Sequence, residues 1–421
     1  MATIVVNYSD FFSADLRKQF GILWSVFDIA GIPVFDQRHE KGLKCVLFRL
    51  CYPFLLHCNL LYCVYSTISH GKLNYSAVID VILPFLACIM WMMMYKRRIS
   101  LKAFLTDLAH ASSKYSTLQN RRLTYGINVA MCSLFIYPPL LNVMKFLQVG
   151  EIRVDEIFRN LQEIVFPCLV AITYSSICYL LLQNLRSCKN MLQKKLDLSC
   201  SGTVEILKQN YLEAIRSVEA FEELFSNPIL IFVFNDFCIV SLITMDIMYD
   251  QNWMMEFLLE SPAYLIFILG ILGFLTICAA DISLEMLSIK SVLLEKMFAH
   301  PHQDAFPYNE KQIDLLLKKD ACVLTAGKAF PFDRGFLLKA LAAVIAQAVV
   351  IYQLGSSLNQ SDHREEESEV SLRSLINYRS AAYRGHSNYK PQRNHNMTPY
   401  WFSLQTCVES FLLQTITRRH Y

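Results

Sequence analysis

Several acidic, amide and aromatic side chains lie within long apolar segments of this chain, where polar groups are costly and are therefore candidates for function. Asp80, Asp236 and Asp246 are the clearest cases, and Asp236 follows directly after another polar residue, Asn235. Apolar walls with a few polar groups are the usual composition of a small-molecule pocket. Taken singly, each Tyr or Trp is better explained by the aromatic belt at a membrane interface. Taken together, the predicted pocket residues are Asp80, Asn142, Thr244, Asp246, Tyr249, Trp253 and Tyr264.

The short sequence motifs of catalysis are missing from the chain. No nucleophile–base arrangement, phosphate-binding loop or HExxH-type zinc motif is present, so we expect neither an enzyme nor a cofactor. The 14 cysteines are scattered, mostly within apolar segments and without a Cys-x-x-Cys pair, which argues against a disulfide framework and a thiolate metal site. His300-Pro301-His302 is the only histidine cluster, and its proline makes it a poor metal site. No Lys/Arg-rich tract indicates nucleic acid as a partner.

The elements that must position the pocket residues are transmembrane helices. The composition is 54% hydrophobic and 18% charged, whereas about a quarter of the residues are charged in a soluble domain. The sequence therefore predicts an all-α, multi-pass membrane protein. Seven segments are apolar and long enough to cross the hydrocarbon core. They are residues 44–69, 76–95, 123–147, 161–185, 227–249, 262–287 and 336–354.

Prolines and one arginine mark details of these spans. Pro138 and Pro139 predict a kink in the third span, and Pro228 is expected near the first turn of the fifth. Arg49 lies inside the first span and must extend its side chain toward the interface.

Basic residues in the short loops predict the orientation, because Lys and Arg concentrate on the cytoplasmic side. Loops 96–122, 186–226 and 290–333 hold seven, six and six of them. The other three loops hold one, two and none. The N-terminus is therefore expected in the cytoplasm and the C-terminus, after seven spans, outside.

Two other classes of membrane protein remain as alternatives. A G-protein-coupled receptor has the reverse orientation, and the chain has no Asp-Arg-Tyr after the third span and no Asn-Pro-x-x-Tyr in the seventh. A secondary transporter should show internal repeats with broken helices, and no similarity between the two halves is obvious.

The chain divides into three expected regions. Residues 1–43 are predicted to be a cytoplasmic segment with a short helix near residues 20–30, and residues 44–354 form the membrane domain. Residues 355–421 are an extracellular tail whose acidic and Arg/Asn/Ser/Tyr-rich composition is typical of disorder.

Two cytoplasmic segments are predicted to be long helices. Apolar residues recur at helical spacing between the fourth and fifth spans, at Tyr211, Ile215, Val218 and Phe225. Residues 311–319 show a similar pattern before the seventh span. Such helices either lie on the membrane surface or pack into a cytoplasmic bundle.

The seventh span carries the most specific motif. Thr325-Ala326-Gly327, an aromatic residue and Pro331-Phe332-Asp333-Arg334 precede an apolar helix at residues 336–354. This order resembles the C-terminal signature of arthropod gustatory receptors, a branch of the insect gustatory and odorant receptor superfamily. That family ends its last helix with Thr-Tyr, five hydrophobic residues and Gln-Phe. Here the matching positions are Ala346-Gln347, residues 348–352 and Gln353-Leu354, so only the Gln is retained.

The resemblance implies a multi-pass receptor of the plasma membrane. It would act as a ligand-gated, non-selective cation channel opened by a small-molecule tastant. Four related subunits, identical or different, would anchor to one another through the cytoplasmic helices, and the last helix of each would line one pore. The ligand would bind among spans two to six, in a pocket open to the outside. The pore and gate residues would be Gln353 and Leu354, with Val350, Gln347 and Ala343 on the same helix face.

Overall fold

The structure is a computed structural model that describes most of the predicted membrane domain. The described residues are 20–34, 43–70, 75–113, 121–149, 160–195, 201–249, 260–299, 318, 321–343, 345–346, 349–350 and 353. Our predictions for residues 1–19, residues 311–317 and the 355–421 tail lie outside them. The same holds for Trp253, Gln347 and Leu354.

Helices make up nearly all of the described chain, as expected for an all-α protein. The only described strands are β1 (Thr325–Ala326) and β2 (Phe330–Pro331), which pair as an antiparallel hairpin. A final helix begins at residue 336. The preceding helices are α2 (Gly21–Ile29), α3 (Leu43–His70), α4 (Tyr75–Ser113), α5 (Arg121–Val149), the π-helix η1 (Leu161–Val165), α7 (Phe166–Lys195), α8 (Ser201–Tyr249) and α10 (Glu260–Ala299).

Five of the described helical segments are long and apolar enough to cross a membrane. They lie in α4, α5, η1 with α7, α8 and α10, at the places of predicted spans two to six. The first predicted span corresponds to α3, which is not among the five, and the seventh is described only in part. Seven spans and their orientation therefore stay predictions.

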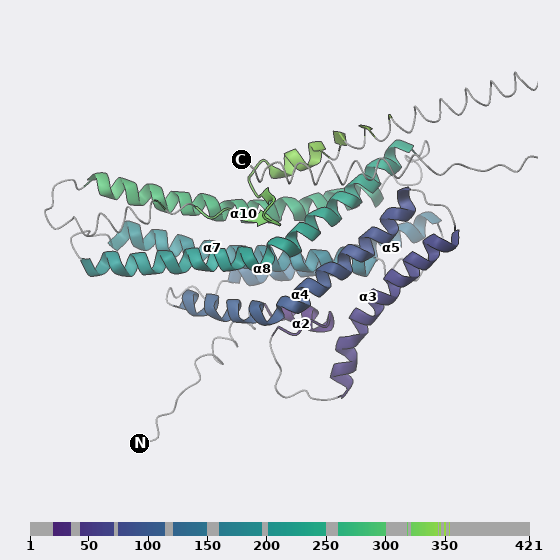
Figure 1. Cartoon of the computed structure of the whole chain (residues 1–421), viewed down its shortest axis with the longest axis horizontal. Helices are drawn as coiled ribbons and strands as arrows, with labels where there is room; N and C mark the ends of the chain where they lie inside the picture. The colour runs from purple at the N-terminus through teal and green to yellow at the C-terminus, as the bar shows by residue number, and fades with distance from the viewer. Residues whose placement is uncertain are drawn as a thin grey trace, which may run out of the picture.

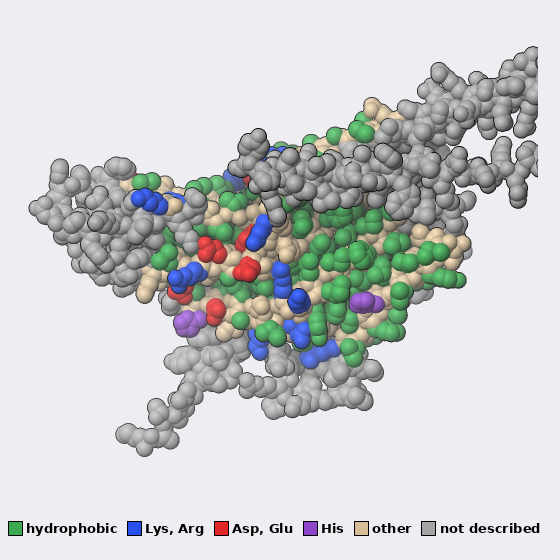
Figure 2. Space-filling view, viewed as in Figure 1, with side chains coloured by type: hydrophobic (Ala, Val, Ile, Leu, Met, Phe, Trp, Pro, Cys, Tyr) green, Lys and Arg blue, Asp and Glu red, His purple; other side chains and the backbone are tan. Residues whose placement is uncertain are grey.

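The helices form an elongated bundle with α7, α8 and α10 running side by side (Figure 1). α7 packs against both α10 and α8, α4 packs along α8, and α3 lies against α4. Figure 2 shows charged side chains over the left and lower middle of this view and mainly hydrophobic side chains over the right. The charged part carries the ends of α7, α8 and α10 that the sequence predicts to be cytoplasmic.

The predicted cytoplasmic helix and the fifth span are one continuous helix. α8 runs for 49 residues, and Tyr211, Ile215, Val218 and Phe225 are all buried. These side chains therefore pack inside the bundle rather than on a membrane surface.

Our prediction that Pro228 lies near the first turn of its helix is wrong, because α8 begins at Ser201 and this residue lies inside it. A proline has no N–H, so the carbonyl of Leu224, one turn earlier, loses its helical donor. The Arg97 guanidinium of α4 donates to this carbonyl and, at 3.0 Å, to that of Glu223. The tertiary contact thus compensates for the proline and lets the helix continue.

The short helix predicted near residues 20–30 is present as α2 and belongs to the core. The buried side chains here are Phe20, directly before the helix, and Leu23 and Phe27 within it. The Trp91 indole of α4 donates to the Ala30 carbonyl at 2.8 Å. Gly31 follows with a φ of 77°, and a Cβ there would lie 2.5 Å from the Arg49 carbonyl oxygen, so only glycine fits this approach.

Candidate functional site

One π-turn at the start of the fourth predicted span brings two polar side chains into the bundle. η1 (Leu161–Val165) contains Gln162 and Glu163, which are 3% and 7% exposed. A π-turn holds an extra residue relative to an α-turn, and such turns occur frequently at functional sites. The local geometry thus turns both residues inward from a segment that is otherwise apolar.

Gln162 joins three elements through a hydrogen-bond network. Its Oε1 accepts from Asn59 Nδ2 of α3 at 2.6 Å. Its Nε2 donates to the carbonyls of Leu56 at 3.4 Å and Pro84 at 3.3 Å. Because both ends of the buried amide have partners, Gln162 holds α3 and α4 against η1.

Asn235 and Asp236 lie opposite, on α8, and are 1% and 4% exposed. Asn235 Nδ2 donates to the Glu163 carbonyl at 3.5 Å, and the two α8 side chains also contact each other. Within the described residues, Asn235 Oδ1 and Asp236 Oδ2 have no hydrogen-bond partner. Both atoms are acceptors.

Aromatic rings from α5 and α10 complete this site. The Tyr137 ring stacks on Phe267 with centroids 4.0 Å apart and lies 6.3 Å from the Tyr264 ring. The carboxyl groups of Glu163 and Asp236 lie in the neighbourhood of the Tyr264 hydroxyl. We name the set Tyr137, Glu163, Asn235, Asp236 and Tyr264 the buried polar cluster.

A second feature, the hairpin clamp, attaches the β1–β2 hairpin to α8. The Thr325 hydroxyl bonds the Glu222 carboxylate, and the Thr325 N–H donates to Glu222 Oε2 at 3.0 Å. Gly327 N–H donates to the Ser226 carbonyl at 2.8 Å, and Lys328 N–H donates to Ser226 Oγ at 3.1 Å. The Thr-Ala-Gly motif is therefore a docking segment on α8.

The small residues of the motif are required by close approach. Ala326 is fully buried. Gly327 has a φ of 63°, in the left-handed region that favours glycine. A Cβ at this position would lie 2.5 Å from Leu230 Cδ2.

The Pro-Phe-Asp-Arg motif fixes the start of the last helix. Phe332 is buried between Tyr174 and Phe336. Lys339 Nζ lies 2.7 Å from Asp333 Oδ2, and this hydrogen bond lowers the pKa of Asp333. The backbone N–H groups of Gly335 and Phe336 also lower this pKa, as at a helix N-cap. Arg334 pairs with Asp281 of α10 at 3.2 Å. The start of the last helix thus contacts both α7, through Phe332, and α10, through Arg334.

Beyond this turn the last helix is largely exposed. Leu337 Cδ2 would lie 3.2 Å from a Cβ on Gly273 of α10, which shows where the two helices approach. Exposed side chains follow at Leu338, Ala343, Ile345, Val349, Val350 and Gln353.

The comparisons with known proteins rest on structure alone. No family model and no curated protein matches the chain. The olfactory receptor OR5 of the insect Machilis hrabei superposes on it with a TM-score of 0.62 at 11% identity. The chain has the fold of an insect olfactory receptor. The match covers 80% of this chain and 98% of the receptor. The same receptor in complex with eugenol gives a TM-score of 0.61 at 13% identity, with the same coverage.

The pocket residues predicted from the sequence fall at different places in this fold. Tyr264 belongs to the buried polar cluster, and Asn142 Oδ1 accepts from Asn160 Nδ2 at 3.0 Å beside η1. Thr244 donates to the Val240 carbonyl of its own helix, and Asp80 is half-buried on α4. The side chains of Asp246 and Tyr249 lie outside the described residues, as does Trp253.

Glu163 was missed as a site residue. It stands near the end of an apolar segment, where a charged residue is usually attributed to the membrane interface. Only the folded chain shows that η1 turns it inward. Asp236 was predicted as a candidate because it lies in an apolar segment beside Asn235. Sequence spacing could not predict that Asn235 Oδ1 and Asp236 Oδ2 have no hydrogen-bond partner within the described residues.

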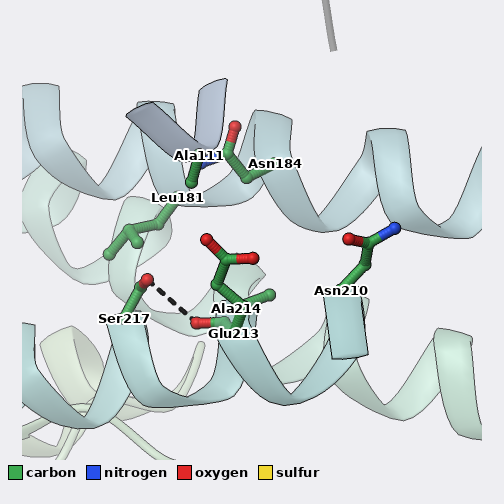
Figure 3. A pocket seen from close by; sticks show the side chains of 7 residues that line it. All are labelled: Ala111, Leu181, Asn184, Asn210, Glu213, Ala214 and Ser217. Atoms are coloured by element: carbon green, nitrogen blue, oxygen red, sulfur yellow. Dashed lines mark hydrogen bonds between the residues drawn. The ribbon is translucent and has the colours of Figure 1, made fainter. Parts of the chain in front are cut away.

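A small cavity lies near the other end of the bundle, between α4, α7 and α8 (Figure 3). Its volume is about 10 Å³, room for about one water molecule. Within the figure, Ser217 donates to the Glu213 carbonyl at 3.0 Å. The described residues contain no group of three or more side chains suited to a metal ion. The cavity is lined by Ala111, Leu181, Asn184, Asn210, Glu213, Ala214 and Ser217.

Proposed function

We propose that the chain is a gustatory-type chemoreceptor of the plasma membrane, a ligand-gated, non-selective cation channel opened by a small-molecule tastant. The observation that carries this proposal is the fold, which matches an olfactory receptor over 98% of its length, one structure of that receptor being a complex with the small molecule eugenol. The C-terminal motif that resembles gustatory receptors supports the narrower assignment.

The exposed last helix supports a multi-subunit pore. Leu338, Ile345 and Val350 are large apolar side chains at the surface of a single chain. In a homo- or heterotetramer, one face of this helix would line the central pore, and the adjacent faces of the same helix would pack on neighbouring subunits. The pore face would carry Ala343, Gln347, Val350, Gln353 and Leu354.

The buried polar cluster is the proposed ligand site. It lies among α5, η1, α8 and α10, in the outer half of the bundle in the predicted orientation. A ligand opens a channel only by binding the open arrangement more tightly than the closed one. Because α8 holds the hairpin clamp and α10 holds Arg334, a shift of either helix would move the start of the last helix.

Expression of the protein alone in a cell line, with current recording against sugars, bitter compounds and amino acids, tests this function. We expect at least one compound to evoke a cation current without added G protein, carried by both Na⁺ and K⁺. Surface-expressed protein that accumulates a substrate, or that signals only when a G protein is present, contradicts the channel.

A further inference from the structure

The last helix turns two different rows of side chains away from the bundle. Its inner face is buried at Phe336 and Ala340, which are each 7% exposed. The exposed positions that follow fall into two rows at helical spacing. One row holds Leu338, Ala342, Ile345 and Val349, and the other holds Lys339, Ala343, Val350 and Gln353.

These two rows differ in polarity. The row of Leu338 is wholly apolar and suits lipid or a neighbouring subunit. The row of Lys339 begins with a charge, continues one turn later with the small residue Ala343 and ends with the amide of Gln353. The Lys339 side chain is 72% exposed, and a charged group on a membrane helix avoids lipid. Of the two rows, the second is therefore the one that suits water, and Lys339 extends the proposed pore face by one turn.

A carboxylate is fixed beside this lysine. Lys339 Nζ lies 2.7 Å from Asp333 Oδ2, and the Asp333 side chain is 50% exposed at the start of the same helix. The next charged residue, Arg334, pairs with Asp281 of α10 at 3.2 Å instead. In the predicted orientation this end of the helix faces the cytoplasm, so each subunit places one neutralised charge pair at the inner end of the pore face.

We propose that Lys339 and Asp333 form a ring of ion pairs at the cytoplasmic mouth of the pore, in which Asp333 neutralises Lys339 and so lets cations enter. Rings of basic side chains exclude cations from a pore, and rings of acidic side chains attract them. The pairing keeps the mouth near neutral, as suits a non-selective cation channel. This inference rests on the proposed function, because the ring needs the last helices of four subunits around one pore.

Thiol reaction rates on the full-length protein in lipid nanodiscs test the ring without a ligand or a current. Ala343→Cys places a thiol one turn from Lys339. The probes are a trimethylammonium and a sulfonate methanethiosulfonate, and mass spectrometry of the peptide that contains residue 343 gives the ratio of the cationic to the anionic rate. We expect Asp333→Asn to lower this ratio about threefold or more and Lys339→Gln to raise it about as much, because each leaves one charge without its partner. The double variant should return to the starting ratio.

Two matched controls accompany this measurement. Ala342→Cys lies on the apolar row and should react with neither probe. Lys102→Gln removes an exposed lysine of α4 and should leave the ratio unchanged. The shifts should shrink in 1 M salt, where the Debye length falls to about 3 Å.

An unreactive Ala343→Cys, equal reaction at residues 342 and 343, or a ratio that fails to move in opposite directions in the two charge variants would overturn the proposal. A pair that only stabilises the helix start would not produce opposite shifts. The result separates from ligand gating. Expected ratios without any evoked cation current contradict the gating alone, and evoked currents with an unchanged ratio contradict this inference alone.

Discussion

Asp333 shows how a single residue of the C-terminal motif acts. Its carboxylate caps the first turn of the last helix and pairs with Lys339 at 2.7 Å. The Asp of the motif therefore makes contacts that fix the start of the last helix. The next residue, Arg334, pairs with Asp281 on α10.

Replacing Asp333 with Ala should loosen this turn by about 1 kcal/mol, the usual value of an N-cap, while Asn should retain most of the capping. Amide hydrogen exchange at residues 335–340 measures the effect. Because Lys339 lowers the pKa of Asp333, its contribution is present above the ordinary Asp pKa and is lost only as the pH falls through the lowered value. Equal exchange in the wild type and both variants, or a loss of protection already at neutral pH, argues against this role.

Gly327 is the second residue whose identity follows from geometry. Gly327→Ala combines a left-handed backbone with a contact of 2.5 Å to Leu230 Cδ2, so we expect a lower Tm and less protein at the cell surface. Adding Leu230→Ala removes the clash but not the backbone strain, and should restore part of the loss. Gly126→Ala is the control, since a Cβ there meets nothing within 4 Å. A Gly327→Ala protein as stable as the control contradicts the clamp geometry.

At the scale of elements, α8 depends on α4 for its continuity. Arg97 supplies the donor that Pro228 cannot, at the carbonyl of Leu224, and donates to the carbonyl of Glu223 as well. The hydrogen bond from Arg97 to the Leu224 carbonyl is a tertiary contact, yet it determines whether the helix continues through Pro228 or begins there.

A double-mutant cycle on this pair tests that dependence. Arg97→Met should cost about 1 kcal/mol in the wild type, because it leaves the partly buried Leu224 carbonyl without a donor. In a Pro228→Ala background the restored N–H serves Leu224, so the same change should cost much less. Thermal unfolding in detergent gives both values, with Arg98→Met as control, since Arg98 lies over its own neighbour Tyr95. Equal losses in the two backgrounds rule out the compensation.

The last helix carries the prediction for the gate. A hydrophobic constriction closes by dewetting, so Leu354→Ser should raise the resting current, and Gln353→Ala should change conductance or ion preference. Recording from cells with matched surface expression measures both. By helical periodicity Ala348 and Ile351 are expected on other faces of this helix, so changing them should disturb packing instead. If both pore variants reach the surface with wild-type currents, this helix does not line the pore.

At the scale of the whole molecule, the prediction concerns the direction in which the chain crosses the membrane. The loop charges predict an N-terminus inside and a C-terminus outside. An epitope tag at residue 1 should therefore be labelled only after permeabilisation, and a tag after Leu354 on intact cells. Labelling of the N-terminal tag on intact cells would reverse the topology and favour the G-protein-coupled alternative.

The sequence predicted those parts of the fold that depend on composition. Spans two to six follow from apolar length, and α2 lies where a short helix was expected. The sequence could not predict features that arise between elements. In the sequence, Pro228 indicates the start of a helix, and only the folded chain shows that Arg97 lies beside it. In the same way, Glu163 resembles a residue at the membrane interface, and only the folded chain shows that η1 turns it inward. Likewise, Gly327 belongs to a recognisable motif, but its contact with Leu230 needs the folded hairpin.

Because α8 is continuous, the number of residues between two of its side chains fixes the angle between them around the helix axis. Glu222 of the hairpin clamp and Asp236 of the buried polar cluster lie on this one helix, 14 residues and about 21 Å apart, nearly four turns. Inserting one residue between them would rotate Asp236 by about 100° relative to Glu222. Inserting seven would add about two turns and nearly preserve the facing, while still displacing the cluster along the axis. Related receptors that keep both features should therefore tolerate substitutions in this interval far better than insertions or deletions.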